Sequence, residues 1–163
     1  MQLGIALYKL SKVESGVEAV FYHWALATYK ERGATHAGLY ELITPDRDGA
    51  KEVSARRDSR LATSAHIIGI VHLGPITELS EEHLHEWLSQ QRADPQDYRL
   101  DGHKWTCATF CLRGIRDLID TGLLNIDATD ADLYYRVLQT GAVLEQHGRG
   151  RGGQVPTVDI VSD

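Results

Sequence analysis

Long hydrophobic runs are missing from this sequence of 163 residues. No uninterrupted apolar stretch reaches the roughly 18 residues that a membrane-spanning helix requires. The first residues also lack the basic and apolar regions of a signal peptide. Cysteine is scarce, with two in the chain, and two cysteines four positions apart do not make a disulfide framework. These absences predict a protein without a membrane span, in a reducing, cytoplasmic setting.

Positive charge is also in short supply. The 17 Lys and Arg residues face 23 Asp and Glu residues, for a formal net charge of -6. Without a basic stripe, nucleic acid is not an expected partner, and the arginines of the Gly-rich segment after His147 are too few for the phosphate contacts that RNA binding needs. No phosphate-binding loop or dinucleotide fingerprint is found, so no cofactor is expected.

The length suits one domain. We expect that domain over residues 1–147, and a flexible Gly- and Arg-rich tail over residues 148–163. Strand-like runs come first and helix-like runs later, which favours an α+β fold with an antiparallel sheet packed against helices. The expected strands are 4–10, 17–28, 35–43 and part of 61–73, with a hairpin joining the second and third and a surface loop over 44–60. The expected helices are 80–88, 105–118 and one that begins at Thr129.

The predicted helix over 105–118 carries the first candidate for chemistry. Cysteine and apolar residues recur along it at three- and four-residue steps, and a turn-like Asp101–Lys104 segment precedes it. Cys107 should therefore lie in the first turn of a buried helix. There the unpaired amide groups and the positive end of the helix dipole favour a thiolate. The alternative is a plain core cysteine, since free cysteines are often buried.

Two of the eight histidines stand out because both lie on the predicted hairpin. His23 is on its first strand, within Phe21–Leu26, and His36 is on its second. Neighbours across a hairpin come within about 5 Å between their Cβ atoms. One imidazole can then orient the other, as the third group of a catalytic triad orients the base.

These stretches carry a family resemblance. The sequence Tyr22-His23-Trp24-Ala25-Leu26, the later His36 and the Thr106–Leu112 segment together resemble the lecithin:retinol acyltransferase family and its relatives among the NlpC-like thiol hydrolases. Small fungal proteins with a His-Trp-Ala-Leu strand are similar as well. The resemblance implies a circularly permuted papain-like fold, with Cys107 as nucleophile, His23 as base and His36 as orienting residue. Permuted deubiquitinase-like isopeptidases also place His before Cys, which keeps a peptidase activity open.

The expected function is cysteine-dependent acyl transfer. His23 would take the thiol proton, and Cys107 would attack a carbonyl to give an acyl-enzyme, with backbone N–H groups at the helix start binding the oxyanion. The substrate would be an acyl, amide or peptide-like compound, and the enzyme either a hydrolase of amides, esters or thioesters or an acyltransferase. Tyr22, Trp24 and Trp105 are the expected walls of the cleft.

Two alternatives remain open at this point. Thr106 stands where the family has Asn, and Ala108-Thr109 where it has Glu-His, which motivates a catalytically inactive papain-like binding module. His103, Cys107 and Cys111 recur every four residues and suggest a zinc site, although a fourth ligand is not evident. We therefore expect no resident metal.

Overall fold

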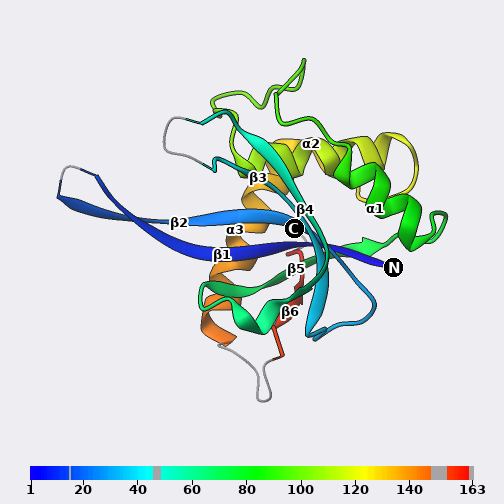
Figure 1. Cartoon of the computed structure of the whole chain (residues 1–163), viewed down its shortest axis with the longest axis horizontal. Coiled ribbons are helices and arrows are strands. Elements are labelled where there is room, and N and C mark those ends of the chain that lie inside the picture. Colours follow the sequence, from blue (N-terminus) through cyan, green and yellow to red (C-terminus); the bar gives the residue numbers. More distant parts are fainter. Residues whose placement is uncertain (15, 46–48, 148–153, 162–163) are drawn as a thin grey trace.

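The computed structural model describes residues 1–14, 16–45, 49–147 and 154–161. Within these residues, six strands form one sheet and three α-helices pack against it (Figure 1). The strands are β1 (Gln2–Glu14), β2 (Val17–Tyr29), β3 (His36–Ile43), β4 (Glu52–Arg60), β5 (Ile67–Pro75) and β6 (Thr157–Asp159). The helices are α1 (Glu81–Ser89), α2 (Cys107–Asp120) and α3 (Asp130–His147).

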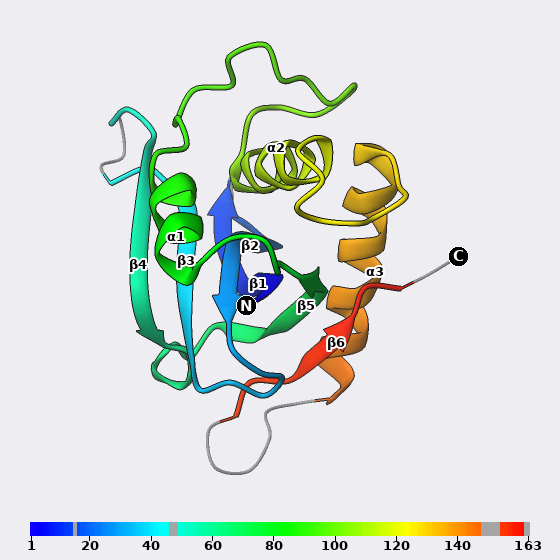
Figure 2. The ribbon, with the colours of Figure 1, turned by 90° about the vertical axis from the view of Figure 1, so that its right-hand side faces the viewer.

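The strand order across the sheet is β4-β3-β2-β1-β5-β6. All neighbours run antiparallel except β5 and β6, which are parallel. Figure 2 shows α2 across the top of the strands, α3 beside β5 and β6, and α1 next to β3 and β4. The mixed α+β class, the antiparallel pairing and the hairpin that joins 17–28 to 35–43 are therefore confirmed.

Alternation along the central strands separates the two faces of the sheet. Leu3, Ile5 and Leu7 of β1 point to the helices and join the larger hydrophobic cluster. Ala6 and its cross-strand partner Ala25 point to the other face, where a smaller hydrophobic cluster forms. The principal core thus lies between the sheet and α2 and α3.

Residues 52–60 form a strand, β4, where the sequence predicts a surface loop. β4 lies at the edge of the sheet, pairs with β3 on one side and exposes most of its side chains. β4 is held in place by backbone hydrogen bonds to β3 and not by buried apolar side chains. Its sequence is therefore polar and lacks the apolar pattern that predicts a strand. The strand predicted within 61–73 is confirmed as β5, which begins at Ile67 after a short 3-10 turn over Leu61–Thr63.

The predicted flexible tail needs a correction over its second half. Residues 148–153 lie outside the described residues, but β6 follows them and pairs with β5. Val155 is 3% exposed and belongs to the smaller hydrophobic cluster. The segment 154–161 is thus part of the domain, because it covers an edge of the sheet that would otherwise stay open.

In the part of the chain that the structure describes, no helix is both long enough and apolar enough to cross a membrane.

The feature that positions the candidate site is an opening in the sheet between β2 and β3. β2 pairs with β1 over its full length, but within the described residues it pairs with β3 only from Leu26 to Thr28. The first half of α2 packs beside β2 here. Gly114 of α2 approaches so closely that a Cβ would meet Leu26 Cδ1 at 3.0 Å.

Candidate active site

Cys107 is the first residue of α2, as the sequence predicts, and its side chain is partly exposed. Thr106 is the N-cap residue, and its amide N–H donates a 2.8 Å hydrogen bond to Thr109 Oγ1. This contact fixes where the helix begins. The amide N–H of Ala108 donates to the Cys107 sulfur and helps to lower the pKa of the thiol. The sulfur thus lies in the first turn of a helix, where a thiolate is favoured.

The two cysteines contact alternate residues of β2. The amide N–H of Trp24 donates to the sulfur of Cys107, and that of Leu26 donates to the sulfur of Cys111. Four helical residues rise about 6 Å and two strand residues about 6.6 Å, so the two spacings nearly match. α2 therefore occupies, beside Trp24, the place that a neighbouring strand would take in a continuous sheet.

His23 of β2 contacts both Cys107 and an acidic residue of β3. Its Nε2 lies 2.7 Å from Glu41 Oε2, and its ring also hydrogen bonds to the Cys107 side chain. The ring of Tyr8, on the neighbouring strand, packs at 6.0 Å between centroids. The imidazole is therefore held on three sides.

Glu41 is buried, with 8% of its surface exposed, and it has two partners. One carboxylate oxygen contacts His23, and the other accepts a hydrogen bond from the guanidinium of Arg56 on β4. A continuous row of hydrogen bonds thus runs from Cys107 on α2 through His23 and Glu41 to Arg56.

The charges in this row support one another. Burial by itself lowers the pKa of His23. The hydrogen bonds to Cys107 and Glu41 outweigh this effect and raise the pKa to about 9. Burial raises the pKa of Cys107, whereas the hydrogen bond and the charge of His23 lower it, and the net pKa falls below the ordinary thiol value. For Glu41, burial is likewise outweighed by His23 and Arg56, so its pKa is lowered. These shifts favour a thiolate–imidazolium pair beside an ionised carboxylate.

Cys111 is a core residue. It is fully buried, and this burial raises the pKa of its thiol well above the ordinary value. The two cysteines, one helical turn apart, thus have opposite electrostatic environments.

His36 does not reach this group, contrary to the prediction that it lies beside His23. It begins β3 with an exposed side chain, opposite Arg60 of β4, and its Nδ1 contacts the hydroxyl of Thr35 at 3.0 Å. The register explains the error. Leu26 pairs with Tyr40, so His36 lies near the far end of β2, and Glu41 reaches His23 instead.

Glu41 is the residue that the sequence reasoning missed. It interrupts the apolar strand sequence Gly38-Leu39-Tyr40-Glu41-Leu42-Ile43. Leu39, Glu41 and Ile43 share the face of β3 that is directed away from the main core. A lone carboxylate within an apolar strand was the available signal, because a buried charge requires a partner.

A cleft of about 570 Å³ opens beside Cys107, between the β1–β2 hairpin and α3. Trp24 forms part of its wall and stacks on Tyr134 of α3, with ring centroids 5.5 Å apart. Leu138 and the ring of Tyr22 add further apolar surface. Two of the three predicted wall residues, Tyr22 and Trp24, therefore line the cleft.

Ionic groups lie at the rim of this cleft. Glu145 of α3 accepts hydrogen bonds from the Tyr22 hydroxyl and from Lys9 Nζ. These contacts tie the hairpin to α3 across the cleft.

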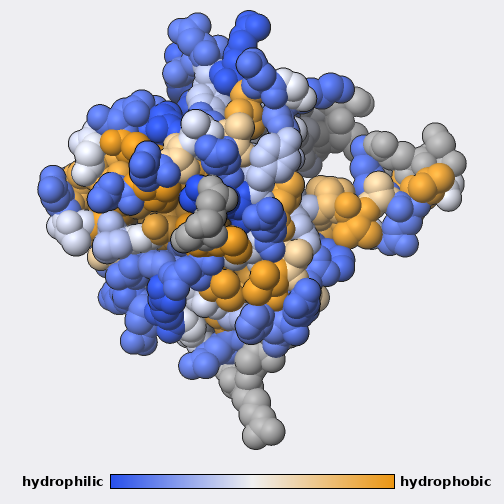
Figure 3. All heavy atoms as spheres, turned by 180° about the vertical axis from the view of Figure 1, so that it is seen from behind, coloured by the Kyte–Doolittle hydropathy of each residue, from blue (hydrophilic) through white to orange (hydrophobic). Residues whose placement is uncertain are grey.

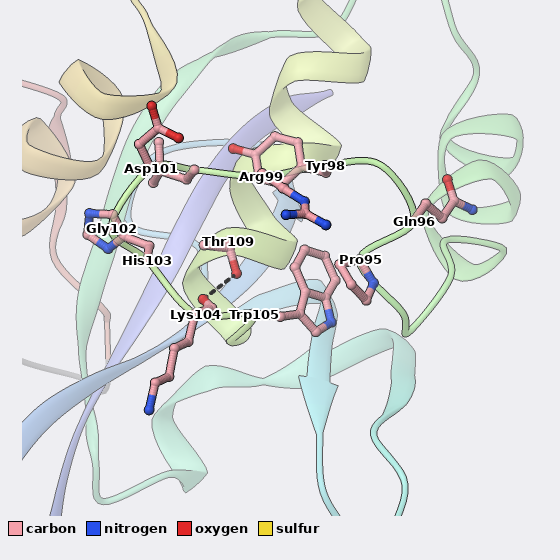
Figure 4. Close-up of a pocket in the computed structure, with 11 residues that line it drawn as sticks. Pro95, Gln96, Tyr98, Arg99, Asp101, Gly102, His103, Lys104, Trp105 and Thr109 are labelled. Atoms are coloured by element: carbon pink, nitrogen blue, oxygen red, sulfur yellow. Dashed lines mark hydrogen bonds between the residues drawn. The ribbon is translucent and has the colours of Figure 1, made fainter.

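Trp105 lies elsewhere. Its indole N–H donates a 2.7 Å hydrogen bond to the carbonyl of Ala93, and its ring packs against the guanidinium of Arg113 at 4.9 Å. It borders a different pocket, shown in Figure 4, where Thr109 Oγ1 donates to the Lys104 carbonyl at 3.3 Å. Trp105 fixes the loop before α2 and does not line the Cys107 cleft.

The proposed zinc ligands do not converge. The His103 ring packs on Tyr134 at 4.3 Å between centroids, while Cys111 lies in the core. Among the described residues, no group of three or more His, Cys, Asp or Glu side chains is placed to hold a metal ion.

Comparison with known proteins gave no match to this chain, whether among family models, curated proteins or solved structures.

Proposed function

We propose that the protein is a cysteine-dependent acyl-transfer enzyme whose catalytic unit is Cys107, His23 and Glu41. The observation that carries this proposal is the contact of a helix-start cysteine with a histidine that a buried carboxylate holds at 2.7 Å. A nucleophile, a base and an orienting group in hydrogen-bond reach are the arrangement that covalent catalysis needs. Glu41 takes the orienting role that the family resemblance assigns to His36.

The reaction begins from the thiolate–imidazolium pair. The Cys107 sulfur attacks the carbonyl carbon of the substrate and forms a tetrahedral oxyanion. The amide N–H of Cys107, in the first turn of α2, has no intrahelical partner and is available to this oxygen. The bond to the leaving group then breaks, and the leaving group takes the proton from His23. Water or another acceptor, deprotonated by His23, finally releases the acyl group from the sulfur.

The order of the parts along the chain supports a permuted papain-like architecture. The base lies on a strand of the sheet and precedes the nucleophile, which opens a later helix. A papain-like site has these parts, with the histidine before the cysteine in permuted members. Hydrolase and acyltransferase differ only in the group that accepts the acyl unit. The apolar cleft beside Cys107 suits the acyl, amide or peptide-like substrates expected from the sequence.

The test is acylation by an activated thioester, followed by intact-protein mass spectrometry. The wild type should show a rapid burst of one acyl group per chain, mapped to Cys107. Cys107→Ser should lose the burst, whereas Cys111→Ser, the matched control one turn along the same helix, should keep it. A wild type that shows no burst with any activated ester would favour the inactive binding module.

A further inference from the structure

The distal half of the β1–β2 hairpin, named here the arm and comprising residues 10–14 and 16–21, extends away from the body of the protein (Figure 1). It carries exposed hydrophobic side chains: Val13 and Val17, each 69% exposed, Val20, 55%, and Phe21, 44%. Figure 3 shows hydrophobic surface on this arm, seen from behind. A two-stranded hairpin is marginally stable in water. We therefore expect a binding partner to cover these side chains and the strand edge of the arm.

The outer edge of β2 in the arm is open among the described residues. β1 occupies one edge of β2 along its whole length, but β3 pairs with β2 only from Leu26 to Thr28. Backbone groups of alternate strand residues point to the same edge. The amides of Trp24 and Leu26 point away from β1, to the two cysteine sulfurs. The N–H and C=O groups of Tyr22 and Val20 therefore point to the same open edge.

This edge runs directly into the catalytic group. Val20, Tyr22 and Trp24 all line the cleft that contains Cys107. The start of α2 stands in the strand position beside Trp24. A chain paired with Val20 and Tyr22 would thus end against the N-terminus of α2, with its next carbonyl at the Cys107 sulfur.

We propose that the substrate is an extended polypeptide that adds to the open edge of β2 as a further strand. This inference rests on the proposed acyl-transfer function and names its substrate class. Backbone pairing with Val20 and Tyr22 sets the register, and the apolar walls at Tyr134 and Leu138 select an apolar side chain on the cleft face. Cys107 attacks the peptide carbonyl beyond this pairing, the C–N bond breaks, the amine takes the proton from His23, and water hydrolyses the thioester.

The experiment compares three thiophenyl esters that share one leaving group: acetyl, octanoyl and an acetylated apolar tripeptide. The rate is that of acyl-enzyme formation on Cys107. We expect the tripeptide ester to react at least about tenfold faster than the acetyl ester, because two backbone hydrogen bonds each contribute a factor of a few. Two further tripeptide esters each carry one N-methylated amide, at adjacent positions. One of them should react no faster than the acetyl ester and the other as fast as the unmethylated tripeptide ester, because alternate amides face β2.

A variant tests the protein side of the same pairing. Val20→Pro removes the amide that faces the open edge, a position that tolerates proline because no ladder bond is lost there. It should lower the ratio of the tripeptide rate to the acetyl rate from about tenfold to about one. Alkylation of Cys107 in the same variant reports whether the catalytic group is still formed. Val20→Ala keeps the amide and should retain most of the advantage.

Each other result overturns the inference in a recognisable way. An octanoyl ester that reacts fastest would identify an acyl-lipid substrate. Equal rates for tripeptide and acetyl esters, or equal effects of both N-methylations, would exclude strand pairing while leaving the acyl-transfer function in place. A wild type that is dimeric by light scattering, with a monomeric Val20→Pro variant, would assign the edge to a second copy of this chain. No acylation by any of the esters would refute the proposed function and this inference together.

Discussion

His23 Nε2 and Glu41 Oε2 lie 2.7 Å apart on adjacent strands that, at this level, share no backbone pairing. The imidazole–carboxylate contact bridges β2 and β3 where the strands separate. The same separation admits the start of α2, so Cys107 reaches the imidazole from between the strands. One irregularity of the sheet therefore brings together all three members of the candidate catalytic unit.

The two cysteines should differ strongly in reactivity. The pKa of Cys107 is lowered by His23, whereas burial raises that of Cys111, which is fully buried. Under limiting iodoacetamide in native buffer, we expect Cys107 to be labelled at least about 100-fold faster, because the thiolate is the reacting form. Peptide mass spectrometry measures both sites in one sample. Equal or reversed labelling would favour a structural cysteine at position 107.

Removal of the Glu41 charge should shift the titration of the thiol. Without the carboxylate, the pKa of His23 falls from about 9, and a less protonated imidazole stabilises the thiolate less, so the pKa of Cys107 rises. In Glu41→Gln we expect the midpoint of the pH profile of Cys107 alkylation to lie about one pH unit higher than in the wild type. A shift of this size is usual for the loss of one neighbouring charge. Glu82→Gln, an exposed change on α1, should have the wild-type profile. Coincident profiles for Glu41→Gln and wild type would separate Glu41 from the site.

Replacement of the two hairpin histidines should have different effects on the acylation rate. His23→Ala should slow acylation by about 10²- to 10⁴-fold, the usual contribution of a general base. His36→Ala should keep the wild-type rate, because its side chain is exposed and contacts Thr35. Stopped-flow release of the leaving group reports both. A strong loss in His36→Ala would restore the role that the family resemblance assigns to this residue.

The packing of the C-terminal segment can be tested at Gly69. A Cβ there would lie 2.5 Å from Leu144 Cδ2 and 2.8 Å from the carbonyl of Pro156. Gly69→Ala should lower the free energy of unfolding by about 1–3 kcal/mol, as overpacking does. At Gly114 a Cβ meets only the end of the Leu26 side chain, and alanine is favoured in a helix by roughly 0.5–1 kcal/mol. Gly114→Ala should therefore cost less in a urea titration. Equal costs would mean that residues 154–161 do not pack as described.

The sequence predicts those parts of the fold whose side chains are periodic. The first three strands and α2 follow from regular apolar spacing, and Cys107 falls at the predicted helix start. β4 and β6 escape prediction because backbone pairing at the sheet edges, which leaves little mark on composition, defines them.

The candidate site shows the same limit. His23 and Cys107 are predicted from local motifs, and the structure brings them together. The third member depends on the register of β3 against β2, which a sequence does not specify: a hairpin loop of unknown geometry decides whether His36 or Glu41 lies near His23. Burial of Glu41 also required Arg56, which sits in the segment predicted as a loop.

The most direct measurement of the central claim is the burst of acyl-enzyme formation by an activated thioester in four proteins: wild type, Cys107→Ser, Glu41→Gln and His36→Ala. The account predicts full bursts in the wild type and in His36→Ala, and none in Cys107→Ser. In Glu41→Gln it predicts a burst slowed by roughly tenfold, since a shift of one pKa unit corresponds to that factor. A burst that persists in Cys107→Ser, or one that Glu41→Gln leaves unchanged while His36→Ala removes it, would contradict the Cys107–His23–Glu41 assignment.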